Sequence, residues 1–499
     1  MEPGVLGFPA VTLETGNYYL TRLLFQRGLG IVYLFAFACA LNQFRPLLGE
    51  HGLLPVPAFI RQVSFRETPS LFFFAPKDWA FAAAAWLGIV LSCLVIAGIA
   101  DRYSWWLNAG IWAGMWILYL SFVNVGQIFY GFGWEDILLE AGFFAMFLGA
   151  RSMETPTIVI YLLRWLEFRI MFGAGLIKLR GDACWRDLSC LDYHYETQPM
   201  PNPLSWYFHA SPQWTHRVGV AFNHFSELLV PFCYFLPQPI ATVAAVVTII
   251  FQGAILASGN LSWLNLLTMV LAIPAIDGRY FAFLVPIREA TPAVPTLLFR
   301  ASLICLAVIV GWLSIDPVRN LLSPGQVMNT SYNPLHLVGT YGAFGSVTRQ
   351  RFEIVVAGTT DSVVTPDTQW KEYEFKGKPN DVGRMPPQIA PYHLRLDWLM
   401  WFAAMSSYQD HPWFVNFMAK LLQDDKAVLS LLKSNPFPGQ RPKFVKADLY
   451  EYHFTDSATR KRTGNWWVRT YTSPYFPAVS MENKSFREIL QQQGWLQTQ

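Results

Sequence analysis

Long runs of apolar residues follow one another from Arg22 to Ile315, and polar positions interrupt them only briefly. A helix that spans a bilayer needs about 20 mostly apolar residues. The pattern therefore predicts a polytopic α-helical membrane protein with about eight or nine spanning or re-entrant helices. The clear candidates are 23–44, 79–100, 105–125, 158–177, 218–236, 240–257 and 297–315, and the shorter ones are 137–150 and 261–276.

From Asp316 onward charged residues return at ordinary density, and short segments with β-branched and aromatic side chains alternate with turn residues. This pattern is typical of strands, here 351–357, 372–376, 450–454 and 466–471. Apolar residues at helical spacing predict helices over 393–405 and 412–432. We therefore expect a transmembrane domain over 1–315, with a structured polar loop at 180–217, and a soluble C-terminal α+β domain over 316–499.

Composition supports this division. Hydrophobic residues make up 53% of the chain and charged residues only 14%, against about 25% charged in a typical soluble protein. The formal net charge of +3 is small for 499 residues, so the chain lacks the basic character of a nucleic-acid-binding protein. The bilayer is the partner that composition predicts.

Charged residues occur inside the predicted helix 158–177, which contains Arg164, Glu167 and Arg169 and is followed by Lys178. A single charge at the centre of a bilayer costs about 3 kcal/mol on insertion scales, so these groups should face other helices and form pairs. Glu167 lies three positions after Arg164, a spacing that allows an ion pair on one helical face. The alternative is a functional Lys178, because burial favours the neutral amine that a general base needs.

Two further sets of polar residues lie in or beside predicted helices. Asn223, His224 and Glu227 share one helical face, which favours hydrogen bonds between helices. A His and a carboxylate at this spacing also suit a metal ion, but no second such pair is evident, so we expect no metal and no cofactor. Glu135, Asp136 and Glu140 begin another helix, where the helix dipole favours negative charge.

Cys184 and Cys190 lie in the polar loop. A disulfide between them is expected if the loop faces an oxidising compartment, and free thiols are expected if it faces the cytosol. Their spacing differs from that of a thioredoxin-type redox pair. The sequence contains no nucleophile elbow, P-loop or Rossmann fingerprint.

Several long strings are similar to the lipase maturation factor family. They are GAGLIKLRGDACWRDLSCLDYHYETQPMPNPLSWYFH (173–209), NHFSELLVPF (223–232), SGNLSWLNLLTMV (258–270), NPLHLVGTYGAFGSVT (333–348) and PYHLRLDWLMWFAA (391–404). The resemblance covers nearly the whole chain. It implies a multi-pass protein that acts as a chaperone without a known reaction and assists the folding and assembly of secreted lipases. It also implies the endoplasmic reticulum membrane with a lumenal C-terminal domain. The chain departs from the vertebrate pattern, with no cysteine in the C-terminal domain and no KDEL-type signal, so the alternative is a bacterial homologue in the inner membrane, whose client need not be a lipase.

A shorter stretch, AGLIK at 174–178 followed by Trp185, resembles vitamin K-dependent gamma-carboxylase. That resemblance implies an alternative function, an intramembrane enzyme with Lys178 as its base. The polar neighbours expected around this base are His194, Glu196 and His224.

Exposed aromatic residues of the C-terminal domain are the candidates for binding a client, because Trp and Tyr dominate binding hot spots. The candidates are Trp466, Trp467 and Tyr471. The alternative interpretation is that these rings fill the core of the β-rich domain.

Overall fold

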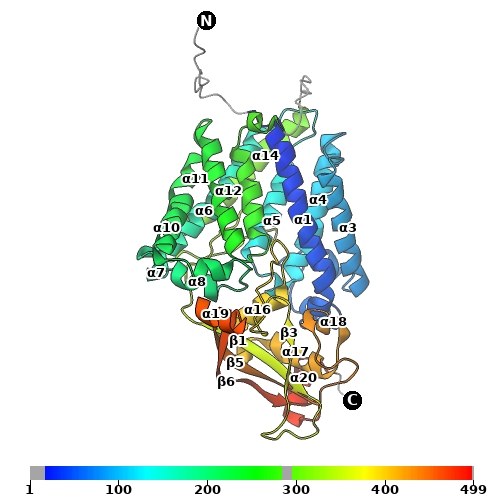
Figure 1. The fold of residues 1–499 in the computed structure, drawn as a ribbon. Helices are drawn as coiled ribbons and strands as arrows, with labels where there is room; N and C mark the ends of the chain where they lie inside the picture. The colour runs from blue at the N-terminus through cyan, green and yellow to red at the C-terminus, as the bar shows by residue number, and fades with distance from the viewer. Residues whose placement is uncertain (1–16, 284–294, 497–499) are drawn as a thin grey trace.

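The chain forms a bundle of helices with a domain of helices and strands attached to one end of it (Figure 1). The computed structural model describes residues 17–283 and 295–496. Residues 1–16, 284–294 and 497–499, which belong to the two predicted domains, lie outside the described residues.

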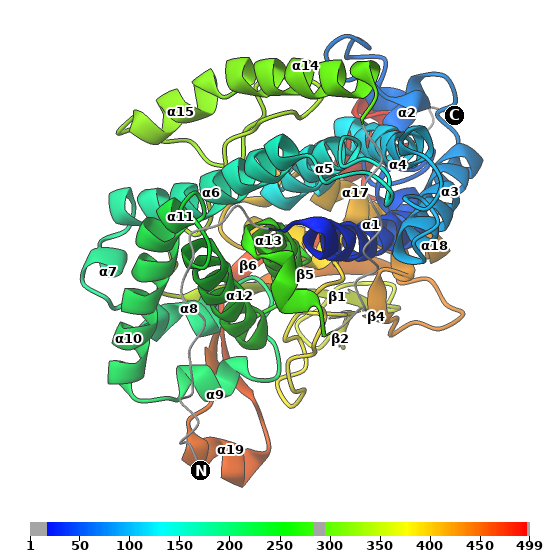
Figure 2. The ribbon, with the colours of Figure 1, turned by 90° about the horizontal axis from the view of Figure 1, so that it is seen from above.

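Five helices of the described chain are long and apolar enough to cross a membrane. Seen from above, the last of them lies along one side of the bundle (Figure 2). This finding confirms that the first part of the chain is built from apolar helices of membrane-spanning length. The five are α1 (Tyr19–Leu48), α3 (Asp78–Ile96), α4 (Trp105–Val125), α12 (Ile240–Ser258) and Leu297–Leu322, which comprises α14 (Leu297–Leu313) and α15 (Ile315–Leu322).

The remaining predicted spans form helices that are shorter or more polar. α6 (Thr157–Arg180) is 24 residues long, but its charged residues keep it out of the apolar set. The predicted span 218–236 starts earlier, within α10 (Gln213–His224), and continues through the π-helical turn η3 (Phe225–Leu229) into α11 (Val230–Cys233). The other helices in this part of the described chain are α2 (Val56–Phe59), η1 (Leu71–Phe73), η2 (Gln127–Tyr130), α5 (Gly133–Ala145), α7 (Ala183–Arg186), α8 (Leu191–Thr197), α9 (Ser205–His209), α13 (Leu264–Ala272), η4 (Ile273–Ala275) and η5 (Gly278–Phe281).

The C-terminal domain contains a four-stranded antiparallel sheet in the order β2-β1-β5-β6. β1 is buried along almost its whole length, whereas β6 lies at the edge of the sheet and pairs only with β5 among the described strands. A separate two-stranded sheet joins β3 and β4. The strands are β1 (Arg351–Thr359), β2 (Lys371–Glu372), β3 (Glu374–Phe375), β4 (Leu432–Ser434), β5 (Phe444–Phe454) and β6 (Trp467–Val479).

Two predicted elements of this domain are divided in the structure. The segment 372–376 is split, because β2 pairs with β1 and β3 pairs with β4. The predicted helix 412–432 ends at Leu422, since Asp424 adopts a positive φ of 54° and Asp425 caps a new helix. The helices are α16 (Arg395–Ala403), η6 (Tyr408–Asp410), α17 (Pro412–Leu422), α18 (Lys426–Leu429), α19 (Ser457–Thr463) and α20 (Lys484–Gln492).

A buried ion pair joins the C-terminal domain to the helix bundle. Nη1 of Arg395, at the start of α16, donates to Glu135 of α5 at 2.8 Å and to the carbonyl of Phe129 at 2.7 Å. The guanidinium lies 3.5 Å from the ring centroid of Tyr130, and the Tyr119 hydroxyl donates to the other Glu135 oxygen. Both charged side chains are fully buried, so each depends on the other for its compensating charge.

Amide side chains extend this junction. Gln43 of α1 donates to the carbonyl of His393 at 2.6 Å and accepts from the backbone N–H of Arg395 at 3.0 Å. Asn416 of α17 donates to the carbonyls of Gly52 and Leu53 at 3.3 and 2.9 Å. Because all of these groups are buried, separating the two parts would leave several polar groups without partners.

We predict that Arg395→Met destabilises the folded protein by about 3–5 kcal/mol, because it leaves the Glu135 carboxylate buried without its cation. Thermal unfolding of the purified protein in detergent measures the loss. The matched control is Arg319→Met, which removes an exposed partner of Asp316 and should cost less than about 1 kcal/mol. Equal losses in the two variants would contradict a central role for the buried pair.

Candidate functional site

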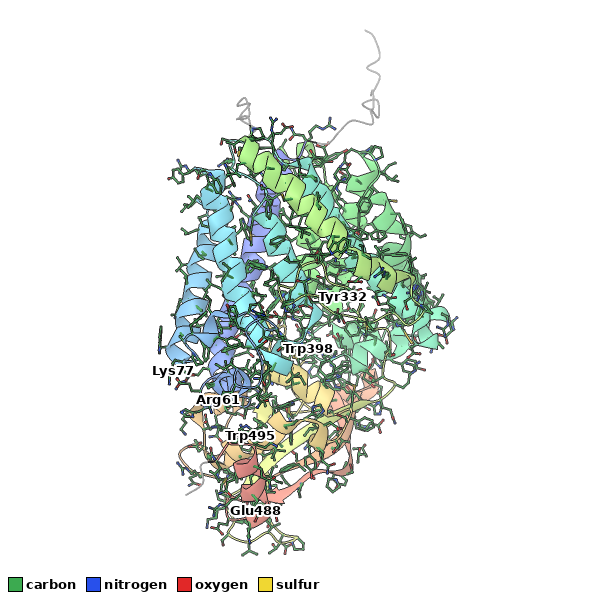
Figure 3. All side chains as sticks on the ribbon, turned by 180° about the vertical axis from the view of Figure 1, so that it is seen from behind. Arg61, Lys77, Tyr332, Trp398, Glu488 and Trp495 are labelled. Atoms are coloured by element: carbon green, nitrogen blue, oxygen red, sulfur yellow. A yellow bond between two sulfur atoms is a disulfide. The ribbon has the colours of Figure 1, made fainter. Side chains whose placement is uncertain are left out.

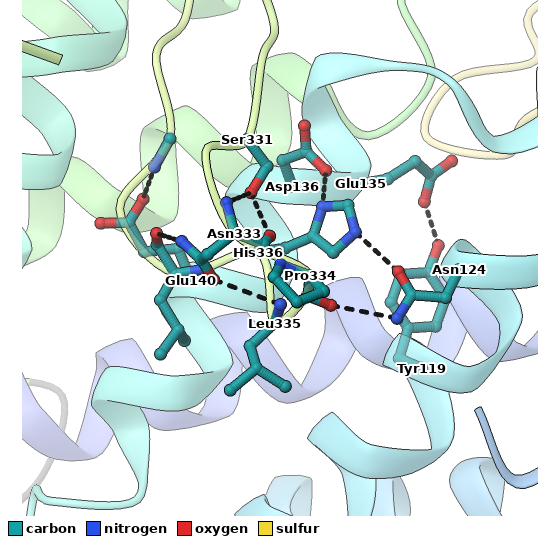
Figure 4. Close-up of polar contacts among 12 residues, drawn as sticks. Tyr119, Asn124, Glu135, Asp136, Glu140, Ser331, Asn333, Pro334, Leu335 and His336 are labelled. Carbon is teal, nitrogen blue, oxygen red and sulfur yellow. Dashed lines mark hydrogen bonds and ion pairs between the residues drawn. The ribbon is translucent and has the colours of Figure 1, made fainter. Parts of the chain in front are cut away.

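A loop that follows α15 is held against the start of α5 by His336 (Figure 4). Nδ1 of His336 lies 2.6 Å from Asp136, and Nε2 lies 2.8 Å from the Asn124 side-chain oxygen. The Asn124 amide also donates to the carbonyl of Pro334 at 3.1 Å. These contacts connect the loop to the last turn of α4 and the first turn of α5. Both turns lie at the end of the bundle that faces the C-terminal domain (Figure 1).

Three groups bind the Glu140 carboxylate of α5 in the same region. The Arg169 guanidinium forms a buried ion pair with it, the Gly339 backbone N–H donates at 3.2 Å, and the Tyr341 hydroxyl donates at 2.7 Å. Sequence reasoning assigned Glu135, Asp136 and Glu140 to the helix dipole and missed these partners. They come from residues 16 to 260 positions away along the chain, a separation over which a sequence pattern carries no signal.

Two glycine-rich runs, 173–181 at the end of α6 and 339–345 in the loop, pack against each other here. A Cβ atom at Gly173 would collide with the carbonyl oxygen of Tyr341, and one at Gly181 would collide with that of Gly345. The close approach of α6 and the loop therefore requires glycine at both positions.

The predicted ion pair between Arg164 and Glu167 is wrong. Arg164 instead donates to the carbonyls of Pro274 and Tyr234, each at 3.0 Å, and to the Tyr18 hydroxyl at 2.9 Å. The Glu167 oxygens have no hydrogen-bond partner within residues 17–283 and 295–496. Arg164 binds these carbonyls instead of Glu167 because helix ends and turns leave carbonyl acceptors free, and the long Arg164 side chain reaches them.

Lys178, near the end of α6, is held by two side chains from the neighbouring helix. Its Nζ donates to Glu227 at 2.6 Å and to Asn223 at 2.9 Å, and the Asn223 amide donates to the second Glu227 oxygen at 2.9 Å. The Trp185 ring lies 5.0 Å from Nζ. Glu227 belongs to the π-helical turn, a distortion that is frequent at functional sites.

Glu227 and Asn223 thus occupy the Nζ of Lys178, whereas a general base must direct its nitrogen at a substrate proton. Of the predicted polar neighbours only His194 lines the same cavity as Lys178. His224 lies 2.8 Å from the Trp185 carbonyl, and Glu196 accepts from the backbone N–H of Phe454. The geometry gives no support to the carboxylase-like alternative, and the described residues hold no group of His, Cys, Asp and Glu suited to a metal ion.

A cavity of about 700 Å³ lies beside the Lys178 pair, between the helix bundle and the C-terminal domain. Trp398, which lines it, lies where the bundle meets the domain (Figure 3). Ligand pockets in proteins are typically about 300–1,000 Å³, so the cavity has the size of a binding site. Its walls come from α5, α6, α8, α10, α12, α13 and α16.

The polar loop 180–217 joins the bundle to the sheet. Cys184 and Cys190 form a disulfide with a Cα–Cα distance of 4.7 Å. Arg349 and backbone N–H groups hold the pKa of Asp182 near 2, well below its usual value. Arg351, at the start of β1, donates to the carbonyls of Glu196 and Gln198 at 2.9 and 2.5 Å. The loop is thus an ordered connection to the sheet.

The three aromatic candidates for client binding differ in exposure. Trp466 and Trp467 are only 8% and 1% exposed, so the expectation that they are surface anchors is wrong for both rings. Trp467 stacks on Phe454, and Trp466 lies beneath the Arg460 guanidinium. Tyr471 is 53% exposed on β6. Trp467 begins β6 and is covered, whereas Tyr471 lies in the stretch of β6 whose residues are mostly exposed, and sequence alone does not say which part of a strand is covered.

Models of known protein families match the chain over most of its length. The model described as the lipase maturation factor transmembrane domain matches residues 20–283, and the one described as the lipase maturation factor C-terminal domain matches residues 337–477. No solved structure matches the chain. The two matches lie on either side of the loop that contains His336.

Curated relatives carry the same family name. Human lipase maturation factor 1 is 44% identical over 536 residues, which cover 99% of this chain and 93% of the human protein. Bovine lipase maturation factor 1 is 42% identical, covering 96% and 92%. Lipase maturation factor 2 of Xenopus laevis is 28% identical, covering 96% and 85%. These matches confirm the family resemblance predicted from the sequence.

Removal of the Lys178 charge separates a structural role from a catalytic one. We predict that Lys178→Met destabilises the protein by about 3–5 kcal/mol, because Glu227 is left buried and unpaired. The double variant Lys178→Met/Glu227→Leu should regain most of that loss, since it removes both charges. Thermal unfolding in detergent measures both variants. A folded, fully stable Lys178→Met protein would contradict this role.

His453 gives the junction a dependence on pH. Burial disfavours its charged form, but Glu196 at 2.9 Å and Glu451 at 3.1 Å outweigh burial and raise its pKa. His209, 3.6 Å from Glu196, has a pKa lowered by burial. The stabilisation from His453 is therefore complete below the ordinary histidine pKa of about 6.5 and is lost as pH rises through the higher folded value.

We predict that His453→Gln lowers the melting temperature most at about pH 6 and least at about pH 9. The difference between wild-type and variant melting temperatures across this range tests the prediction. His51→Gln, a substitution of an exposed histidine that forms no ion pair within residues 17–283 and 295–496, is the control and should show no such trend. A difference that is constant with pH would rule out the linkage.

Proposed function

The chain belongs to the lipase maturation factor family, and we propose that it assists the folding and assembly of secreted lipases. The observation that carries the proposal is the 44% identity to human lipase maturation factor 1 over 99% of this chain. We propose a chaperone-like action without a chemical reaction, because Lys178 is held as an ion pair with Glu227. The partners are then the membrane and a lipase, or another secreted protein that folds by the same route.

We propose that the protein is a multi-pass protein of the endoplasmic reticulum membrane with its C-terminal domain in the lumen. Disulfides persist in oxidising compartments, and the Cys184–Cys190 disulfide supports this side for the loop 180–217. The same loop contacts β1 and β5 through Glu196, so the domain shares its compartment. In a bacterium the periplasmic side of the inner membrane meets the same condition.

The proposed topology adds further segments to the five apolar helices. These are α5, α6, α13 and the continuous segment from α10 to α11, which lie within the same bundle (Figure 1). The buried charges of α5, α6 and the α10–α11 segment argue for crossing inside the protein, because charged side chains in membranes face other helices. With them the chain reaches the eight or nine crossings predicted from the sequence.

The client is proposed to bind on the exposed side of β6. This strand lies at the edge of the sheet, and edge strands present backbone N–H and C=O groups that an extended peptide can pair with. Tyr471 and Val468 are about half exposed on it. A rigid aromatic side chain beside a free strand edge suits an incompletely folded chain whose own strands lack partners.

The test is secretion of active lipase from cells that lack their own maturation factor. We expect the wild-type chain to restore secretion, and we expect Tyr471→Ala to restore about tenfold less, the effect of losing a moderate hot spot. Tyr103→Ala, which alters an exposed tyrosine in the connection between α3 and α4, is the matched control and should rescue as well as wild type.

Two outcomes contradict these proposals separately. An inserted, folded wild-type chain that restores no lipase would remove the lipase client. Full rescue by Tyr471→Ala would leave the function intact and move the client-binding surface away from Tyr471. Truncation at Asp316 is a poorer test, because it removes Arg395 and leaves Glu135 unpaired in the bundle.

A further inference from the structure

The cavity between the bundle and the C-terminal domain has a mouth on the side of an apolar helix. Ala254 of α12 lines the cavity and is exposed, and Gly219, Phe222 and Ile255 line it and are half-buried. α12 is one of the five helices suited to crossing a membrane. An opening at this position faces the hydrocarbon of the bilayer, so a molecule that enters through it comes from the membrane.

The depth of the cavity matches the lipid–water interface. Ala254 lies about one helical turn before the end of α12 at Ser258, and Lys178 lies near the end of α6 at Arg180. Both helices end on the side that carries the C-terminal domain (Figure 1). The glycerol esters of membrane lipids lie at this boundary between the hydrocarbon and the polar headgroups.

The polar part of the cavity offers unused hydrogen-bonding groups. Lys178 has three N–H donors and uses two of them on Glu227 and Asn223. His194 makes ring contacts with Phe344 and Tyr195, and neither ring nitrogen has a hydrogen-bond partner in the part of the chain that the structure describes. Both residues line the cavity, so an oxygen-bearing group placed there finds donors from two sides.

The charges of this region are balanced. Lys178 is matched by Glu227. Burial and the charge of Lys178 lower the pKa of His194 to about 4, so its ring is neutral and supplies one donor and one acceptor. A phosphate or a free carboxylate would bring an unmatched charge into a buried site, which is costly. An uncharged head with carbonyl and hydroxyl oxygens meets these groups without that cost.

We propose that this cavity binds one neutral glycerolipid from the bilayer, with its ester and hydroxyl oxygens at Lys178 and His194 and its acyl chain along the apolar wall. The ester carbonyl accepts from the free N–H of Lys178, and the free hydroxyl pairs with His194. The apolar lining from α6, α12 and α13 surrounds the chain. The C-terminal domain closes the far side with Trp398, Trp401 and Phe402 of α16. This site goes beyond lipase maturation and does not depend on it.

The test uses the full chain in phosphatidylcholine nanodiscs that contain a diacylglycerol with a diazirine on its acyl chain. After irradiation and digestion, mass spectrometry locates the cross-links. We expect them on cavity residues of α6, α10 and α12. Unlabelled diacylglycerol should compete, whereas free oleate and phosphatidic acid should not.

Two variants of α12 form a matched pair. Ala254→Phe fills the mouth and should reduce labelling about tenfold. Gly253→Phe places the same ring on the adjacent residue, where a Cβ meets no atom within 4 Å, and should leave labelling unchanged. His194→Phe keeps a flat ring but removes both hydrogen-bonding groups, and should also lower labelling about tenfold. Ile255→Trp narrows the same mouth and replaces Ala254→Phe if that variant fails to fold.

Three results would overturn the proposal. Equal labelling in Ala254→Phe and wild type would show that the lipid does not use the mouth. Cross-links confined to the outer surface of the bundle would show that it does not enter the cavity. Competition by phosphatidic acid as strong as by diacylglycerol would refute the neutral head. Each readout is independent of lipase secretion, so failure here and failure of the proposed function are distinguishable.

Discussion

The buried ion pair between Glu135 and Arg395 is the contact on which the rest of the structure depends. Two opposite charges out of water are stable only while they remain together and hydrogen-bonded. The pair meets this condition through Tyr119, Phe129 and Tyr130. Because one charge belongs to the bundle and the other to the C-terminal domain, neither part reaches its lowest energy without the other.

The same principle recurs across the junction. Carboxylates of the first part of the chain form hydrogen bonds with groups of the second. Asp136 bonds to the His336 ring, Glu140 accepts from the Tyr341 hydroxyl, and Glu196 accepts from the backbone N–H of Phe454. The two domains recognised in the sequence therefore form one connected body. A rigid connection of this kind fits the proposal that the protein presents an exposed strand to a client at a constant height above the membrane.

The cavity exists because the helix bundle and the C-terminal domain do not pack closely along their whole boundary. The helices of the bundle form its sides, and α16 closes it only along part of its boundary. Arg395 begins the helix that carries Trp398 and Phe402, so the ion pair also positions the cavity wall. Lys178, a candidate base on the sequence pattern, forms an ion pair with Glu227 at the edge of the cavity. Its structural role and its place beside a lipid-sized cavity are compatible.

By itself the sequence determined the class of the protein, its helices of spanning length, the strands of its C-terminal domain and its family. The family follows from long strings of matching residues, and the other features depend on local periodicity and on the length of apolar runs, which neighbouring residues decide together. Tertiary structure alone decided the partners of the buried charges. Arg164 binds carbonyls that helix ends leave free, Lys178 binds Glu227 of another helix, and Trp467 is covered by its own sheet. Glu135 and Arg395 lie 260 positions apart, and only the folded chain brings such groups within reach, because a hydrogen bond acts over about 3 Å.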